Sequence, residues 1–115
     1  MYRSISHQPG KTMQIRKINT CLQLVRMSNR KINKIRSSEG ESQIHRDKKE
    51  EICNALEAEG HAYICEPIFK TGGKADILVL DLFKIIEIAV TETEASLKAK
   101  AEYYPPGLTI EMIRC

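Results

Sequence analysis

The chain has 115 residues, of which 42% are hydrophobic and 29% are charged, values typical of one globular domain with a modest core. No apolar run approaches 18 residues, and no apolar signal core follows the N-terminus, so the sequence predicts neither a membrane span nor a secretory signal. The four scattered cysteines include no CxxC pair. They predict neither a zinc motif nor a disulfide framework, and favour reduced thiols in a cytoplasmic protein.

The charge is distributed unevenly, although the net value is only +3. Residues 1–38 contain nine Lys or Arg and no acid, whereas residues 39–115 contain the other nine basic residues and all 15 acids. A basic arm on an acidic domain is typical of a protein with a polyanionic partner, most simply nucleic acid. A solvated leader explains the same composition, and Met13 and Met27 also allow a start codon further along the chain.

The N-terminal third shows little apolar periodicity. Residues 1–37 are predicted to form a basic, mostly disordered arm, with a helical segment near 19–28. The folded domain is predicted to span residues 38–115 and to begin with a helix over 42–59, which Gly60 ends.

The remaining elements follow from apolar runs and from turn residues. Strands are expected at 61–69, 75–80 and 84–90, followed by a helix from about 91 to 103 and a last strand at 108–114. The order helix, three strands, helix, strand predicts an α/β fold with a mixed sheet flanked by helices.

Two acids lie within strand-like apolar runs. Asp76 begins ADILVL and Glu87 lies inside KIIEIAV, although burying an ionised carboxylate is costly without a compensating cation or donor. If these strands pair antiparallel through a tight turn, both acids approach one point and could share a Mg²⁺ ion, which prefers oxygen ligands. Alternatively, Glu87 pairs with Lys84 or with a helix lysine, and Asp76 caps the turn.

These motifs, GKADILVLD and IIEIAV in this element order, resemble the PD-(D/E)XK nuclease superfamily, which includes Holliday-junction resolvases and many restriction endonucleases. The resemblance covers about two thirds of the chain, residues 38–115. It implies a restriction-endonuclease-like αβββαβ core and hydrolysis of DNA phosphodiester bonds that depends on Mg²⁺ or Mn²⁺ and is directed by DNA structure rather than by sequence. It also implies that Asp76 and Glu87 bind the catalytic metal, that Glu41 of the first helix completes the site, and that the protein forms a homodimer.

One position departs from that pattern. The family pattern has Lys, sometimes Glu or Gln, two residues after the second acid, and this chain has Ala89 there. An alanine can neither orient the attacking water nor stabilise phosphate charge. Three explanations stay open: metal-bound water suffices with help from Glu92 or Glu94, cleavage has been lost while binding remains, or another lysine has taken the role. The lysines available for that role are Lys74, Lys98 and Lys100.

The expected partner is DNA, bound through its backbone by the basic arm and by side chains near the site. The side chains expected to contact it are His45, Lys48, Lys49 and Lys74. Tyr103 and Tyr104 either pack on the sheet or stack on bases. Two further hypotheses are a catalytically inactive nuclease-fold module that binds DNA, and an interaction domain whose acids pair with its own lysines.

Overall fold

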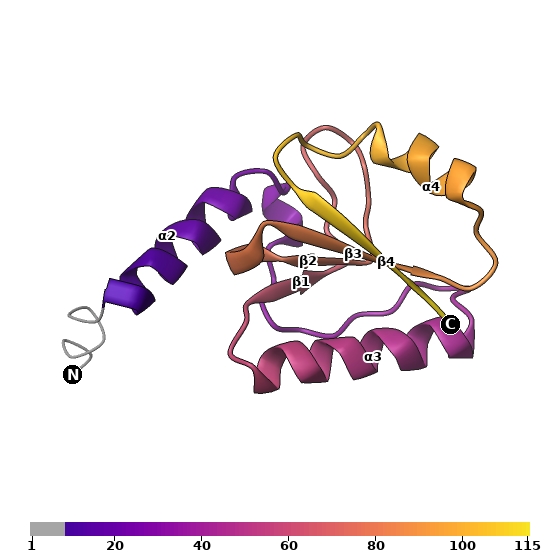
Figure 1. Ribbon diagram of the computed structural model, residues 1–115, viewed down its shortest axis with the longest axis horizontal. Coiled ribbons are helices and arrows are strands. Elements are labelled where there is room, and N and C mark those ends of the chain that lie inside the picture. The colour runs from indigo at the N-terminus through magenta and orange to yellow at the C-terminus, as the bar shows by residue number, and fades with distance from the viewer. Residues whose placement is uncertain (1–8) are drawn as a thin grey trace.

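The computed structural model describes residues 9–115, with side chains from Thr12 onward, and is an α/β fold (Figure 1). Its helices are α2 (Pro9–Leu22), α3 (Gln43–Ala58) and α4 (Glu94–Ala101), and short 3-10 turns occur at η1 (Met27–Asn29) and η2 (Leu80–Leu82). Its strands are β1 (Tyr63–Cys65), β2 (Ile77–Val79), β3 (Lys84–Ala89) and β4 (Thr109–Arg114). Within these residues, no helix is long and apolar enough to cross a membrane.

The four strands form one mixed sheet in the order β1-β2-β3-β4. The first three strands are antiparallel, and β4 runs parallel to β3 because α4 carries the chain back across the sheet. The predicted α/β class and mixed sheet are therefore confirmed. Ile77 of β2 pairs with Ile86 of β3, so that Asp76, directly before β2, lies beside Glu87.

The two faces of the sheet carry separate apolar clusters. In Figure 1, α3 and α4 lie on opposite sides of the sheet. Strand alternation decides which residues join each cluster. Cys53 and Leu56 of α3 pack with Ile86 and Ile88 on one face. On the other face, Ile85 packs with side chains from three separate segments: Cys21, Val25, Phe69 and Tyr104.

The segment before α3 differs from its prediction. A mostly disordered arm was expected over residues 1–37, but the structure has α2 there, and the side chains of Cys21 and Val25 are fully buried. Val25 also bridges to Phe69 as a short piece of strand. The described part of the arm thus belongs to the folded unit, because its few apolar residues find partners distant in sequence that local periodicity does not reveal. Residues 1–8 of the predicted arm lie outside the part of the chain that the structure describes.

The predicted elements are otherwise present with shifted ends. The first strand stops at Cys65 because Glu66 has a left-handed backbone (φ 52°) and Pro67 has no N–H to donate. The last helix begins after Thr93, whose hydroxyl accepts a hydrogen bond from Ser96 N, rather than at about residue 91 as predicted.

Candidate functional site

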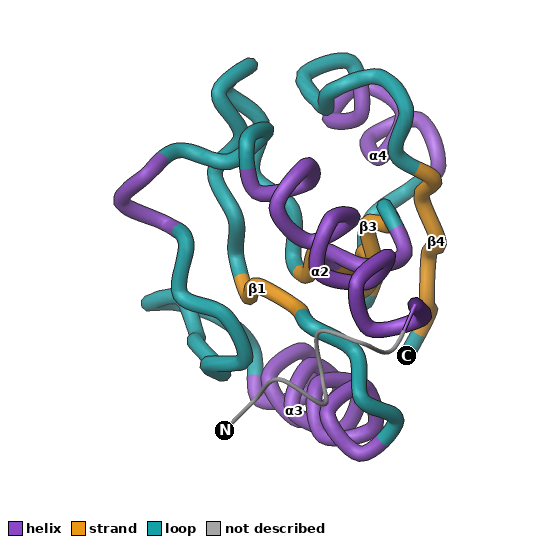
Figure 2. The backbone as a smooth tube through the Cα atoms, turned by 90° about the vertical axis from the view of Figure 1, so that its left-hand side faces the viewer, coloured by secondary structure: helices purple, strands orange, loops and turns teal. Residues whose placement is uncertain are grey.

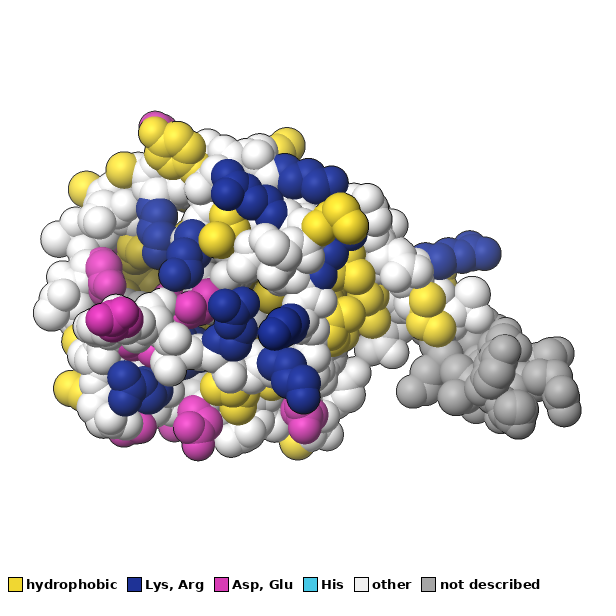
Figure 3. Space-filling view, turned by 180° about the vertical axis from the view of Figure 1, so that it is seen from behind, with side chains coloured by type: hydrophobic (Ala, Val, Ile, Leu, Met, Phe, Trp, Pro, Cys, Tyr) yellow, Lys and Arg dark blue, Asp and Glu magenta, His cyan; other side chains and the backbone are white. Residues whose placement is uncertain are grey.

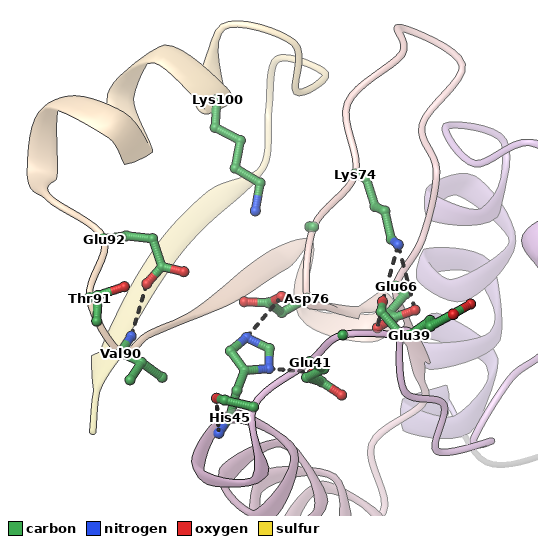
Figure 4. A pocket seen from close by; sticks show the side chains of 14 residues that line it. Glu39, Glu41, His45, Glu66, Lys74, Asp76, Val90, Thr91, Glu92 and Lys100 are labelled. Carbon is green, nitrogen blue, oxygen red and sulfur yellow. Dashed lines mark hydrogen bonds and ion pairs between the residues drawn. The ribbon is translucent and has the colours of Figure 1, made fainter.

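A pocket of about 520 Å³ opens at the end of the sheet where β2 begins and β3 has just ended (Figure 4). The start of α3, the loop before β2, the segment after β3 and one side of α4 all contribute to its wall. Five acids, two lysines and one histidine line it: Glu39, Glu41, Glu66, Asp76, Glu92, Lys74, Lys100 and His45. Carboxylates therefore dominate its charge.

Asp76 and Glu87 lie side by side, as the strand pairing predicted. The Asp76 backbone N donates to Glu87 Oε1 at 2.9 Å, and Ile88 N donates to Asp76 Oδ2 at 2.7 Å. Each carboxylate is thus oriented by a main-chain donor of the other strand segment. This reciprocal bonding compensates part of the cost of burying Glu87, which is only 2% exposed.

The second oxygen of Glu87 points toward the α4 side of the sheet. Lys100 Nζ lies 3.0 Å from Glu87 Oε2, and the Tyr104 hydroxyl donates to the same oxygen at 2.8 Å. Burial, together with the charge of Glu87, raises the pKa of Tyr104, so that the phenol stays a donor. Lys84 pairs with Glu111 instead. Of the two lysine partners considered for Glu87, Lys84 and a helix lysine, the structure therefore has the helix lysine.

Tyr104 packs against the sheet rather than standing free. Its ring meets Phe69 edge to face, with centroids 5.5 Å apart, whereas Tyr103 is 60% exposed. The packing alternative therefore holds for Tyr104, and stacking remains open for Tyr103 alone.

His45 lies between two carboxylates, as Figure 4 shows. The Ser42 hydroxyl caps α3 by accepting from His45 N, which places His45 in the first turn of the helix above Glu41. His45 Nδ1 contacts Glu41 Oε2, and His45 Nε2 lies 3.3 Å from Asp76 Oδ1. The histidine thus connects the acid that precedes α3 to the sheet.

Lys49 has a different role from the predicted one. It was expected to contact nucleic acid, but its side chain is fully buried, with Nζ 2.8 Å from Glu41 Oε2 and 2.9 Å from Glu66 Oε2. Burial alone would lower the pKa of Lys49, and the two carboxylates outweigh it and raise that pKa. Lys49 is consequently an internal counter-ion, and the predicted nucleic-acid contact is wrong.

The contacts with Lys49 also change the pKa values of Glu41 and Glu66. Burial by itself would raise the pKa values of Glu41 and Glu66, but hydrogen bonds outweigh burial and hold both values below the usual 4.5. The donors are Lys49 and His45 for Glu41, and Ser38 and Lys49 for Glu66. Both acids therefore remain ionised in the folded protein near neutral pH.

Glu66 was missed by the sequence analysis. It accepts from Ser38, pairs with Lys49, and lies 3.6 Å from Lys74 Nζ through its other oxygen. The signal that singled out Asp76 and Glu87 was present here too, since Glu66 is the one acid in the apolar run YICEPIF.

The predicted lysines separate into two groups. Lys74 and Lys100 line the pocket, and in Figure 4 Lys100 points from α4 into the space beside Asp76. Lys48 pairs with Glu51 on α3 at 3.2 Å, outside the pocket. Lys98 lies with Glu87 and Glu94 at a second hollow of about 190 Å³ and forms no ion pair within the described residues. The structure therefore brings Lys100, not Lys98, to the pocket.

Glu92, one of the acids expected to assist a metal-bound water, is in the pocket, and its Oε2 accepts from Val90 N at 2.9 Å. Glu94 lies at the second hollow instead. The position of the missing lysine, Ala89, is 1% exposed and offers no polar group.

The partners of the carboxylate oxygens bear on whether these acids could bind a metal ion. In residues 9–115, no group of three or more His, Cys, Asp or Glu side chains is arranged to hold a metal ion. Glu41 Oε1 is buried without a hydrogen-bond partner, but it faces Arg46 Nε at 4.0 Å. Asp76 and Glu87 are adjacent, and each of their four carboxylate oxygens already has a partner: His45 and Ile88 N for Asp76, and Asp76 N, Lys100 and Tyr104 for Glu87.

No protein-family model, curated protein or solved structure matches the chain. The fold and the site define it as an α/β domain with an acidic, lysine-flanked pocket at the end of a mixed sheet.

Proposed function

We propose that this protein is a metal-dependent endonuclease that hydrolyses DNA phosphodiester bonds at the pocket beside Asp76. One observation carries the proposal: two carboxylates on neighbouring strand segments, Asp76 and Glu87, are fixed against each other by main-chain donors. A rigid pair of acids at a sheet end is an arrangement suited to a divalent cation. The resemblance of GKADILVLD and IIEIAV to the PD-(D/E)XK nucleases supports the same assignment.

A bound Mg²⁺ would supply a polarised phosphodiester and a more acidic water. The ligands proposed for it are Asp76 and Glu87, with Glu41 connected to them through His45. Ile88 N and Asp76 N each hold one oxygen of these acids, so a cation that binds Glu87 through its other oxygen would displace Lys100 or Tyr104 from it.

The role of the lysine that the family pattern has at the position of Ala89 is assigned to Lys100. Its ammonium contacts Glu87 and lines the pocket from α4, so it can stabilise negative charge that develops on a phosphate there. This places the positive charge on the helix after β3 instead of at Ala89. Lys74, on the opposite wall, can position the strand by contacting a neighbouring phosphate.

A second candidate function is a noncatalytic DNA-binding module with the same fold. The internal ion pairs favour it, since Lys49 neutralises Glu41, Lys100 neutralises Glu87, and neither acid then requires a metal. Under this alternative the pocket would have no catalytic role, and DNA would bind to the surface beside it.

The experiment is cleavage of labelled duplex, single-stranded and four-way-junction DNA in Mg²⁺ and in Mn²⁺. Asp76→Asn is the test variant because asparagine keeps an oxygen that can accept from Ile88 N while losing the charge. Asp47→Asn on the exposed side of α3 is the matched control.

Metal-dependent cutting that disappears in Asp76→Asn and persists in Asp47→Asn is the expected result. If folded protein binds these DNAs and cuts none of them in either metal, the binding module is correct and the nuclease assignment is wrong.

A further inference from the structure

Two acid-free segments form a basic surface that borders the pocket. Residues 24–38 and 67–75 together contain seven Lys or Arg and no Asp or Glu. Six of the seven side chains are exposed, and Arg30 is half-buried. We call this surface the basic face; its residues are Arg26, Arg30, Lys31, Lys34, Arg36, Lys70 and Lys74. Figure 3 shows Lys and Arg side chains gathered on one side of the molecule next to a group of acids.

The fold holds these two segments together. Arg26 N donates to Ile68 O at 2.9 Å, and Lys70 N donates to Leu24 O at 2.9 Å. Further along, Asn33 exchanges hydrogen bonds with Tyr63 at the outer edge of β1. The view in Figure 2 shows the loops outside β1 running alongside the sheet. The seven charges are therefore carried by backbone fixed to the domain.

The basic face leads directly into the pocket. Ser38, the last residue of the first segment, donates to Glu66 Oε2, and Lys74 donates to the Ser38 hydroxyl at 3.3 Å. Both Ser38 and Lys74 line the pocket that contains Asp76. A chain-like ligand lying on the basic face would thus reach the acids without leaving the surface.

Most of this charge has no internal counter-ion. Among the residues that the structure describes, no ion pair involves six members of the basic face: Arg26, Arg30, Lys31, Lys34, Arg36 and Lys70. By contrast, Lys48, Lys49, Lys84 and Lys100 each contact a carboxylate. Unpaired and clustered charge of one sign is what an external polyanion neutralises.

Apolar side chains lie between these charges, and they bear on whether the polyanion is a membrane surface or a nucleic acid. Met27, Ile32 and Ile35 are exposed, a combination that also occurs where proteins bind anionic membranes. Membrane binding of that kind uses an amphipathic helix, however, and this stretch contains only the three-residue turn η1.

An exposed aromatic lies at the border of the basic face. The Thr71 hydroxyl donates to Tyr103 O at 2.5 Å, and a Cβ at Gly73 would come within 2.8 Å of that same carbonyl oxygen. Gly73 therefore allows the loop after Lys70 to pack tightly against Tyr103, whose ring is 60% exposed. Aromatic rings beside a basic groove stack on nucleic-acid bases.

From these observations we propose that the basic face binds the sugar–phosphate backbone of DNA and directs the strand into the pocket beside Asp76. This inference rests on the proposed function and extends it, because it names the surface that holds the substrate. It retains the basic arm and Lys74 from the expected DNA contacts and leaves out His45, Lys48 and Lys49.

The test is DNA binding in EDTA, where metal-dependent cleavage cannot occur, measured by fluorescence anisotropy with labelled single-stranded and duplex DNA between low and physiological salt. The test variant is Lys34→Gln with Lys70→Gln, since neither side chain makes a hydrogen bond or an ion pair within the described residues. The control is Lys48→Gln with Lys84→Gln, which removes the same charge from two ion-paired lysines.

The test variant is expected to bind DNA about tenfold or more weakly near 0.1 M salt, with the slope of log affinity against log salt reduced by roughly 1.5–2. The control is expected to bind as the unchanged protein does. Equal weakening in both variants, or in neither, overturns the proposal, as does tighter binding to phosphatidylserine vesicles than to DNA. If the protein cuts none of the DNAs but the two variants bind as expected, the nuclease assignment fails and this proposal stands. If the protein cuts in a metal-dependent way but both variants bind equally, this proposal fails and the nuclease assignment stands.

Discussion

The ammonium group of Lys100 is the positive charge nearest to the buried acid of β3. It lies 3.0 Å from Glu87 Oε2, although the Lys100 side chain is 43% exposed and starts on α4. Its neighbour Lys98 is two residues earlier and points toward the second hollow, because side chains two apart cannot share one face of a helix. The two lysines therefore form a matched pair that differs in access to the pocket.

If Lys100 performs the role that Ala89 cannot, Lys100→Met should lower the rate of metal-dependent DNA cleavage by about 10²-fold or more, within the range for a lost acid–base or charge-stabilising group. Lys98→Met should cut at nearly the normal rate. Single-turnover assays on the preferred DNA measure both. Similar rates for Lys100→Met and Lys98→Met would remove Lys100 from the mechanism.

Lys48 and Lys49 form a second matched pair, adjacent in sequence and opposite in environment. Lys49 is fully buried between Glu41 and Glu66, whereas Lys48 is 30% exposed beside Glu51. Removing Lys49 leaves two carboxylates without their shared cation, and breaking a buried pair in this way typically costs about 3–5 kcal/mol.

Lys49→Met should therefore lower the free energy of unfolding by about 3–5 kcal/mol, while Lys48→Met should change it by less than about 0.5 kcal/mol. Urea unfolding followed by circular dichroism measures both values. A small effect at Lys49 would mean that Glu41 and Glu66 are solvated or protonated when the lysine is absent.

At the scale of the site, strand register could be predicted and long-range ion pairing could not. The approach of Asp76 to Glu87 follows from one antiparallel pairing and a short turn, which are local features. The contact of Lys49 with Glu66 joins α3 to the end of β1, and nothing in either local pattern marks it. That is why Lys49 was predicted as a surface contact.

At the scale of elements, the connection between β2 and β3 is fixed by a buried acid. Asp81 Oδ1 accepts from Ala62 N at 2.9 Å, and Oδ2 lies 2.7 Å from His61 Nδ1, so η2 is tied to the turn between α3 and β1. Gln14 of α2 reaches the same carboxylate at 3.3 Å. One side chain thus joins three parts of the fold.

Asp81 should make stability depend on pH. Burial alone would raise the pKa of Asp81, but hydrogen bonds from His61 and Ala62 N outweigh it and hold that pKa below the usual 3.8. The unfolded chain then takes up the proton first, so the stabilisation is present above about pH 4 and is lost as pH falls further.

Asp81→Asn should destabilise the fold by about 1–3 kcal/mol at pH 7 and should flatten the decline of stability below pH 4. Unfolding free energies measured at several pH values between 3 and 7 test this, with Asp47→Asn controlling for the loss of one charge. A decline as steep as that of the unchanged protein would assign the acid sensitivity to other carboxylates.

Element type could be read from the sequence more reliably than element ends. The helix over 42–59 and the strand over 84–90 were predicted nearly in full because each has a long, consistent apolar pattern. The first strand was predicted too long, since the apolar run continues through Glu66 and Pro67 although the backbone turns there. Backbone geometry overrides the apolar pattern at such points.

At the scale of the whole molecule, the N-terminal segment is part of the core as well as a carrier of charge. Cys21 and Val25 are fully buried in the cluster around Ile85, and Ile18, Leu22 and Leu24 pack against that cluster. The same segment supplies the backbone hydrogen bonds that hold the loop before β2. The homodimer implied by the family resemblance stays a prediction.

A shortened chain that begins at Met27 should therefore lose about 4 kcal/mol or more of stability, because it lacks Cys21, Val25 and the hydrogen bonds of Leu24 and Arg26. Since domains of this size are stable by only about 5–15 kcal/mol, this truncation should unfold at far lower urea concentration or fail to fold.

A chain that begins at Met13 is the control, because it keeps the described contacts of Gln14 and all the buried residues named above. Its unfolding midpoint should lie well above that of the chain beginning at Met27. If the chain beginning at Met27 unfolds with the same midpoint and the same denaturant slope as the chain beginning at Met13, the α2 segment adds no stability. The apolar cluster around Ile85 would then be stable without the α2 segment. The stabilising role assigned to the buried side chains of Cys21 and Val25 would be wrong.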